Sequence, residues 1–328
     1  MKLSIVTTMY NSASYLLEFY TRITKAASQI TPDYEIIFVD DGSPDHSLDV
    51  AHQLHLLDAK VKIVQLSRNF GHHKAMATGL KHADGEYVFL IDSDLEEDPA
   101  LLQNFWDEIH KENKTDVVYG VQEERKGHWF ERWSGALYYK VLNSLSDEVK
   151  STKNISTIRL MKRDYVKSLI EYQEHGYYFG PISILVGFNQ QSYIFKKNCK
   201  ERSSYSFFRK YHMFLDSIIS FSSKPLYFIF YFGSAVTLFS FIFMIYLIIK
   251  KLYWGVAMEG WTTLVVLTSL FGGLIMFFMG LMSVYILHIF KETKNRPFSV
   301  VRKIIARDAA SLQEMNVKSI CEQSRGEV

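Results

Sequence analysis

Two long uncharged segments constrain this chain more than any other feature of its sequence. Residues 226–249 and 261–290 contain no Asp, Glu, Lys or Arg. Each segment is longer than the roughly 20 residues that an α-helix needs to cross a bilayer. Helices in the core of a soluble protein rarely stay uncharged over such a length. The sequence therefore predicts a membrane region at 224–292 with two transmembrane helices.

The link at 250–260 is short, so the two predicted helices are antiparallel and both chain ends lie on one side of the membrane. The link holds only two basic residues, Lys250 and Lys251. The flanks hold nine: Arg209, Lys210, Lys224, Lys291, Lys294, Arg296, Arg302, Lys303 and Arg307. Under the positive-inside rule, we expect a multi-pass protein of the inner (plasma) membrane with its soluble domain and both termini in the cytoplasm.

The rest of the chain divides around this hairpin. We expect a soluble domain at 1–220, a juxtamembrane segment at 200–223 and a polar tail at 293–328. The segment 206–223 is either an amphipathic helix on the lipid surface or an ordinary packed helix. Gly272, Gly273 and Gly280 in the second span permit close helix contact, and so a homo-oligomer.

Composition excludes several classes of protein. The net charge of +2 gives no field that would attract nucleic acid. Two distant cysteines, Cys199 and Cys321, exclude a disulfide scaffold and a cysteine-based zinc module. The turn at 7–12 contains no glycine, which excludes the dinucleotide-binding fingerprint of an oxidoreductase.

Short apolar runs alternate with helical patterns through the first hundred residues. The sequence predicts strands at 3–8, 35–40, 61–67 and 86–92, and helices at 14–29, 47–57, 73–82 and 99–111. Four strand–helix repeats predict an α/β fold with a mostly parallel, Rossmann-like sheet covered on both faces. In such sheets ligands bind beyond the carboxyl ends of the strands.

The second predicted strand ends in two adjacent acids, Asp40 and Asp41. Neighbouring carboxylates repel each other unless they have partners, and a nucleoside offers suitable donors in its base and ribose. Asp45, which follows Gly42, is better interpreted as a helix cap than as a ligand.

The fourth predicted strand leads into an acidic segment at 92–98. Extended geometry would turn Asp92, Asp94 and Glu96 to the same side. A hard divalent cation would offset their repulsion, because such ions prefer oxygen ligands. The alternative is a solvated acidic loop before a helix, which suits Glu97 and Asp98 better than it suits the first two acids.

The segment 68–74 follows the third predicted strand and brings basic residues and a helix N-terminus to the same edge. This setting suits a phosphate group. The adjacent histidines His72 and His73 suggest a metal pair, but adjacent residues rarely ligate one ion, so we do not favour that interpretation.

These segments together resemble a known family. Val39-Asp40-Asp41-Gly42-Ser43, Arg68-Asn69-Phe70-Gly71 and Asp92-Ser93-Asp94 occur in the order and spacing of the family 2 glycosyltransferases with the GT-A fold. The hairpin resembles that of the polyprenyl-phosphate glycosyltransferases, the group that includes dolichol-phosphate mannose synthase and the bactoprenol glucosyltransferases. The resemblance covers about residues 1 to 295 and is most specific in the first hundred.

The resemblance implies a role for each matching residue. Asp40 would bind the nucleoside, and Asp92 and Asp94 would hold Mg²⁺ or Mn²⁺, with Asp94 as the chief ligand and Glu96 nearby. Arg125, Arg159 and Arg202 would hold an acceptor phosphate, since arginine matches phosphate in a bidentate way; a surface salt bridge is the alternative for each. The further binding candidates are Thr8, Tyr10, Asn11, Asp41, Asn69, Lys74 and Ser206.

The chain departs from the family pattern in its second half. Gln122, Ser204 and Phe207 replace a frequent Arg, Gly and Lys, and the segment 156–159 lacks an expected Asp. All these positions fall where the family contacts its acceptor.

The resemblance implies a metal-dependent, inverting transfer of a sugar from a UDP- or GDP-sugar to a polyprenyl phosphate of the undecaprenyl type in cell-envelope glycan synthesis. Membrane lipid is then a partner, and nucleic acid is not. One alternative is a glycosyltransferase that acts on a lipid-linked saccharide. The other is a membrane protein that binds sugar nucleotides without catalysis.

Overall fold

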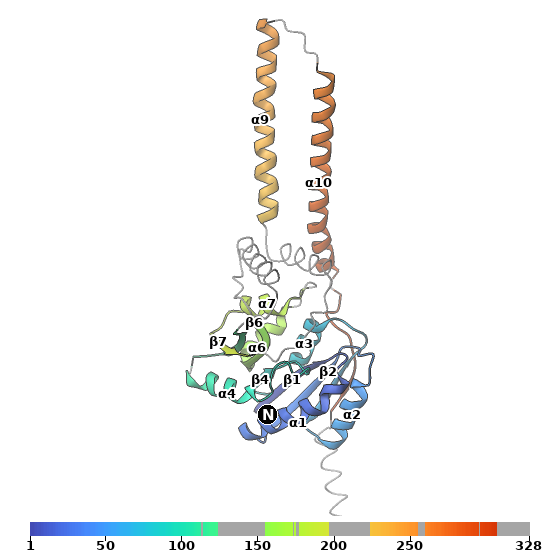
Figure 1. Ribbon diagram of the computed structural model, residues 1–328, viewed down its shortest axis with the longest axis vertical. Helices are drawn as coiled ribbons and strands as arrows, with labels where there is room; N and C mark the ends of the chain where they lie inside the picture. The colour runs from blue at the N-terminus through green and yellow to red at the C-terminus, as the bar shows by residue number, and fades with distance from the viewer. Residues whose placement is uncertain are drawn as a thin grey trace, which may run out of the picture. The chain divides into compact units, whose positions relative to one another are not determined.

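The computed structural model describes residues 1–112, 114–123, 155–172, 174, 177–196, 224–254, 260–294 and 296–306. The chain divides into two units. The first unit comprises 1–128, 152–203 and 297–328, and the second comprises 129–151 and 204–296. The first unit is built on a sheet and the second on two long helices (Figure 1).

An eight-stranded mixed sheet forms the first unit, in the order β7-β5-β6-β4-β1-β2-β3-β8. The pairs β1–β2, β2–β3, β1–β4 and β5–β7 are parallel, whereas β6 runs antiparallel to β4 and β5. The strands are β1 (Leu3–Met9), β2 (Tyr34–Asp40), β3 (Val61–Leu66), β4 (Tyr87–Leu90), β5 (Val117–Gln122), β6 (Ile155–Lys162), β7 (Gln190–Phe195) and β8 (Val301–Ile305).

Helices cover both faces of this sheet. The side chains of α1 (Ala13–Ile30), α2 (Ser47–Leu57) and α4 (Leu101–Lys111) join one buried apolar cluster. Those of α3 (His72–Lys81), α6 (Arg163–Glu171) and α7 (Phe179–Leu185) join a second cluster on the other face.

The buried sheet confirms the predicted fold class. Every residue of β1 and β2 is buried, as expected for parallel strands that helices cover on both sides. The four predicted strand–helix repeats are confirmed, with small differences at their ends. The largest difference is at β4, which ends at Leu90, so Asp92 does not belong to the strand.

The antiparallel strand β6 was not predicted, and its direction matters for the site. Leu90, the last residue of β4, pairs with Arg159. Because β6 runs opposite to β4, its first residues lie at the edge where β1 to β4 end.

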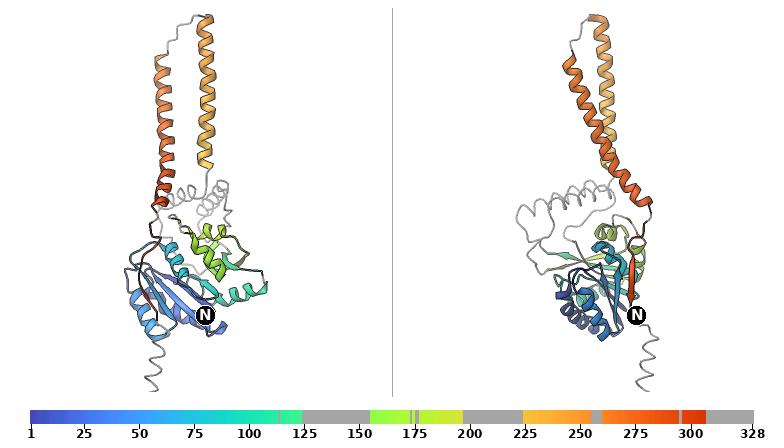
Figure 2. Two further views of the ribbon diagram at one scale, coloured as in Figure 1. Left: turned by 180° about the vertical axis from the view of Figure 1, so that it is seen from behind. Right: turned by 90° about the vertical axis from the view of Figure 1, so that its right-hand side faces the viewer.

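The segment that follows the second apolar helix was expected to be a polar tail, and part of it instead completes the sheet. β8 pairs antiparallel with β3 at the edge of the sheet (Figure 2). The Ser67 N–H donates to the Val300 carbonyl (2.9 Å), and the hydroxyls of Thr78 and Ser299 lie 2.6 Å apart. Without β8, the edge of β3 would present unpaired backbone N–H and C=O groups, and β8 pairs with them.

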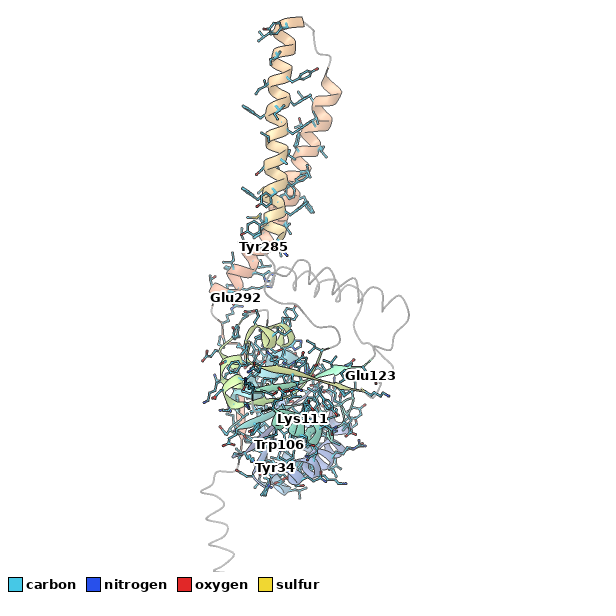
Figure 3. The ribbon with its side chains drawn as sticks, turned by 90° about the vertical axis from the view of Figure 1, so that its left-hand side faces the viewer. Tyr34, Trp106, Lys111, Glu123, Tyr285 and Glu292 are labelled. Atoms are coloured by element: carbon cyan, nitrogen blue, oxygen red, sulfur yellow. The ribbon has the colours of Figure 1, made fainter. Side chains whose placement is uncertain are left out.

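The second unit contains the two helices expected from the uncharged segments, α9 (Lys224–Trp254) and α10 (Trp261–Thr293). Leu226–Phe243 and Leu270–Thr293 have mean hydropathies of 1.9 and 2.2, and neither is buried. Side chains stand out around both helices, with Tyr285 and Glu292 on α10 (Figure 3). By length and composition both helices can cross a membrane.

Asp45 joins the loops that follow β1 and β2. Its carboxylate accepts hydrogen bonds from the Ala13 N–H (3.0 Å) at the start of α1 and from the Ser47 N–H (3.1 Å) at the start of α2. It also accepts bonds from the hydroxyls of Ser43 and Ser47. The expected cap is therefore present, and it serves two helices at once.

Replacing Asp45 should therefore lower stability in a pH-dependent way. Burial would raise the pKa of Asp45, but the bonds from Ser43, Ser47 and Ala13 outweigh it and lower the pKa to about 2. A pKa below the unfolded value means that the stabilisation is complete above about pH 4 and is lost as the pH falls towards 2. We expect Asp45→Ala to cost about 1–2 kcal/mol near neutral pH, measured as a lower Tm of the full chain in detergent.

The control is Asp49, which forms an exposed pair with His46 at the start of α2. Asp49→Ala should change the Tm little, because exposed ion pairs contribute little. The difference between the Asp45→Ala protein and wild type should shrink between pH 4 and 2. A Tm for Asp45→Ala equal to that of Asp49→Ala would contradict this role.

Candidate functional site

The candidate site lies where the parallel strands end. β1 lies between β2 and β4, so the strand order reverses beside β1 (Figure 1). Ligands of open α/β sheets bind in the crevice at such a reversal. Thr8, Asp40 and Asp92 lie at or just beyond the ends of β1, β2 and β4.

Asp40 is the last residue of β2 and is 2% exposed. Its Oδ1 accepts a hydrogen bond from the Ser43 N–H (3.0 Å). Burial raises the pKa of Asp40; the Ser43 bond opposes this shift, and the charges of Asp41 and Asp45 add to it. A buried carboxylate at a strand end is suited to accept hydrogen bonds from a ligand's N–H or hydroxyl groups.

Asp41 has a different position from the one that its sequence suggested. Its two carboxylate oxygens accept bonds from the backbone N–H groups of Phe70 (2.7 Å) and Gly71 (3.0 Å). Burial raises the pKa of Asp41, while these two bonds, His72 and Arg68 oppose the shift. Asp41 therefore fixes the loop 68–71 that leads into α3.

Gly42 allows this loop to approach. It adopts φ +65°, a conformation that favours glycine, and a Cβ placed there would lie 2.7 Å from the Asn69 nitrogen and 2.8 Å from the Arg68 carbonyl carbon. The loops after β2 and β3 are therefore in direct backbone contact.

His72 is a central residue of the site, although the sequence analysis named it only as part of a metal pair that was not favoured. Its Nδ1 lies 3.0 Å from the Thr8 hydroxyl, and its Nε2 lies 3.3 Å from Asp92 Oδ1. Burial would lower the pKa of His72, but Asp92, Asp41 and Asp94 outweigh it and raise that pKa. His72 thus lies between the ends of β1 and β4.

The pKa of His73 is shifted in the opposite direction. Burial and the neighbouring His72 lower its pKa to about 4, so its ring is neutral near pH 7. Its ring lies against Tyr178, at 6.3 Å between centroids. The two histidine rings also lie near each other, with their centroids 5.7 Å apart. His72 follows Gly71 directly and is the first residue of α3. This position at a helix start was the sequence signal that could have indicated its role at the site.

The acidic segment 92–98 is a folded loop rather than an extended strand. Asp94 Oδ1 accepts a bond from the Glu96 N–H (3.0 Å), and Leu95 between them adopts φ 61°. The Ser93 hydroxyl donates to the Thr8 carbonyl (2.8 Å). The extended geometry assumed for this segment was therefore wrong, and whether Asp92, Asp94 and Glu96 share one side stays a prediction.

The burial of Glu97 also differs from the sequence interpretation, which placed its side chain in solvent. It is fully buried, and the Ser156 hydroxyl donates to its Oε1. Asp98 has the expected role, since its Oδ1 accepts a bond from the Ala100 N–H (3.0 Å) just before α4. The acidic segment therefore combines a buried carboxylate, a helix cap and two candidate ligands.

The predicted metal ligands Asp92, Asp94 and Glu96 lie together in the loop 92–98. Within the described residues, no group of three or more His, Cys, Asp or Glu side chains is gathered as a metal cage. Asp92, Asp94 and Glu96 therefore do not form a preformed three-ligand site. Mg²⁺ usually takes one or two carboxylates together with substrate phosphates, and the oxygen donors of Asp92 and Asp94 fit that pattern.

The remaining candidates lie around this centre. Tyr10 is 51% exposed, Asn11 and Asn69 are exposed, and the ammonium of Lys74 lies 5.4 Å from the Phe298 ring centroid. The exposed positions are accessible to a ligand. Arg125, Arg202 and Ser206 lie outside the described residues.

Arg159 is only 1% exposed, which does not suit direct contact with an acceptor phosphate. Its Nε donates to the Thr157 carbonyl (3.2 Å) and its Nη2 to the Ser156 carbonyl (3.3 Å). The guanidinium also stacks on the Phe179 ring, 4.5 Å from its centroid.

A family model and several known proteins match this chain, and the relatives match it over most of its length. The sequence model described as Glycosyl transferase family 2 matches residues 4–170. A Mycobacterium tuberculosis protein named as a glycosyltransferase is 44% identical over 97% of this chain and 93% of its own length. The bactoprenol glucosyl transferase of Shigella phage SfII is 28% identical over 92% of this chain and 98% of its own length.

Among solved structures, glucosyl-3-phosphoglycerate synthase from Mycobacterium tuberculosis in complex with UDP is similar with a TM-score of 0.48 at 16% identity. The match covers 67% of this chain and 78% of that chain.

A side chain at Gly42 should separate the loops after β2 and β3. We expect Gly42→Ala to break the Asp41 bonds to Phe70 and Gly71, since the new Cβ would overlap the Asn69 backbone. Hydrogen exchange of the amides of residues 70 and 71 should become faster, and the Tm should fall.

Gly187 provides a matched control, because it has φ +76° but nothing within 4 Å of the position of a Cβ. Gly187→Ala should carry only the backbone strain of about 1–3 kcal/mol. It should leave exchange at residues 70 and 71 unchanged. Unchanged exchange at those amides in Gly42→Ala would show that the loop contact is not needed.

Proposed function

The chain belongs to glycosyl transferase family 2, and from this premise we propose that it transfers a sugar from a UDP- or GDP-sugar to a polyprenyl phosphate of the undecaprenyl type in cell-envelope glycan synthesis. One observation carries the proposal. Asp40, His72 and Asp92 converge at one sheet edge in a chain that also has two helices able to cross a membrane.

The donor half of the proposal follows from the site geometry. Asp40 accepts hydrogen bonds from the nucleoside, and the exposed Tyr10 and Asn11 line the approach to it. The diphosphate lies towards the N-terminus of α3, where His72 and the helix dipole favour negative charge. Asp41 acts indirectly, by holding the loop that presents this helix end.

Asp92 and Asp94 hold Mg²⁺ or Mn²⁺ in this proposal, with Asp94 as the chief protein ligand. When bound, such an ion acts as a Lewis acid that neutralises charge on the leaving nucleoside diphosphate. A structural neighbour, the mannosyltransferase PcManGT from Pyrobaculum calidifontis, was solved in complex with GDP-Man and Mn²⁺.

The acceptor half rests on the names of relatives and on charge. Several relatives are bactoprenol glucosyl transferases, whose name points to a lipid acceptor. An acceptor phosphate is already ionised at pH 7, so its attack on the sugar needs no general base. Direct in-line attack inverts the anomeric carbon. Arg125, Arg202 and Ser206 are the proposed contacts of this phosphate.

In this proposal the helices α9 and α10 anchor the enzyme in the membrane that holds the acceptor. A polyprenyl phosphate is confined to the bilayer, and an anchored enzyme meets it at a high effective concentration. We propose an inner-membrane protein with the catalytic unit and both termini in the cytoplasm, following the distribution of basic residues. The glycines of α10 are available for pairing with a second copy, because no atom lies within 4 Å of a Cβ at Gly272, Gly273 or Gly280.

The decisive experiment incubates the purified full chain with undecaprenyl phosphate and a panel of labelled UDP- and GDP-sugars. A lipid product that carries one sugar on its phosphate is expected with one donor. Label on a lipid-linked saccharide instead would favour the alternative acceptor. Donor binding without transfer to any lipid would identify a non-catalytic binding protein.

Asp94→Asn should lower kcat by about 100-fold or more, because a metal ligand contributes several kcal/mol to stabilising the leaving group. The matched control is Asp98→Asn in the same loop, where an amide oxygen can still accept the Ala100 bond. The control should keep at least about half of the activity. Equal rates for the two variants would remove Asp94 from the proposed site.

Arg202→Ala tests the acceptor side separately. The loss of a charge-assisted hydrogen bond to phosphate should raise the acceptor KM by about 10-fold or more. The donor KM should stay unchanged, since Arg202 is assigned to the acceptor alone. An equal rise in both KM values, measured with saturating co-substrate, would contradict this assignment.

A further inference from the structure

The first residues of β6 connect the acidic loop to the rest of the sheet. The Thr157 hydroxyl donates to Asp92 Oδ2 (3.2 Å), and the Ser156 hydroxyl donates to Glu97 Oε1. Consecutive strand residues point to opposite faces, so these hydroxyls reach the loop from its two sides. Two adjacent residues thus hold both ends of the segment 92–97.

Arg159 holds these two residues in turn. It lies two positions after Thr157 and donates to the carbonyls of Ser156 and Thr157. The guanidinium is almost fully buried, a costly placement unless its charge meets fixed acceptors. Within the described residues, no ion pair between Arg159 and a carboxylate is found, and backbone carbonyls and the Phe179 ring take that place.

Asp92 therefore has partners on two sides. His72 approaches Oδ1 from the start of α3, and Thr157 donates to Oδ2 from the start of β6. His72 is 45% exposed at its side chain, whereas Arg159 behind Thr157 is buried. The contact from β6 is thus backed by a buried side chain.

We propose that Thr157, backed by Arg159 and accompanied by Ser156, is a positioning residue that sets the orientation of Asp92 for the divalent cation. The inference rests on the proposed function, since it deepens the assignment of Asp92 as a metal ligand. Arg159 acts through this chain of hydrogen bonds and does not contact the acceptor phosphate. Residues that hydrogen-bond a metal-ligating carboxylate fix its orientation and so tune its affinity for the ion.

Loss of the Thr157 hydroxyl should weaken ion binding without removing a ligand. Valine has nearly the same shape as threonine, so Thr157→Val keeps the packing and deletes only the donor. We expect the Kd for Mn²⁺ to rise about 10-fold, the range found for residues that support metal ligands. Binding of the nucleoside diphosphate alone should stay the same, because Asp40 is untouched.

The test measures free Mn²⁺ by electron paramagnetic resonance during titration of the purified full chain in detergent. The titration is made in the presence of UDP, with GDP in a parallel series. Thr157→Ser, which restores the donor, should return the Kd to within about 3-fold of wild type. The control is Thr115→Val, because the Thr115 hydroxyl also donates over 3.2 Å to a side-chain oxygen, that of Gln191, in a part-buried bond. It should leave the Kd unchanged.

An unchanged Mn²⁺ Kd in Thr157→Val would overturn the proposal. If that variant does not fold, Ser156→Ala takes its place, with a severalfold rise in Kd expected and an unchanged Kd overturning the proposal. A wild-type chain that binds no Mn²⁺ with either nucleotide would refute the metal of the proposed function together with this inference. Wild-type binding with an unaffected Thr157→Val would refute the inference alone.

Discussion

Electrostatic repulsion between carboxylates at one sheet edge is the constraint on which the site depends. Two carboxylates about 5 Å apart repel by roughly 3 kcal/mol in a protein environment. The fold offsets this repulsion separately for each acid. Asp41 binds backbone N–H groups, Asp45 binds the ends of two helices, and Asp92 lies between His72 and Thr157.

Because their hydrogen-bond partners differ, these acids have different roles in the structure. Asp41 and Asp45 accept hydrogen bonds from the backbone around them and so hold the loops in place. Asp40, Asp92 and Asp94 remain the acids assigned to the donor and its cation. Acids that look alike in the sequence therefore have different partners in the structure.

Much of the first unit follows from its sequence. The strands β1 to β4 are predictable, because apolar runs between helical patterns admit few arrangements other than a covered parallel sheet. The site edge follows too, since Asp40 and Asp92 come after such runs. The loop at 92–98 was not predictable, because Leu95 turns it with a backbone conformation uncommon for leucine.

The sequence by itself determined the two apolar helices, the parallel half of the sheet and the position of the acids along the chain, because local periodicity and charge encode all three. Only the tertiary structure decided which acids are held by backbone, that Glu97 and Arg159 are buried, and that β6 and β8 join the sheet. Those outcomes depend on contacts between residues far apart in the chain: Thr157 with Asp92, Ser156 with Glu97 and β8 with β3. No local pattern records such pairs, since each partner is chosen by the strand order and direction of the whole sheet.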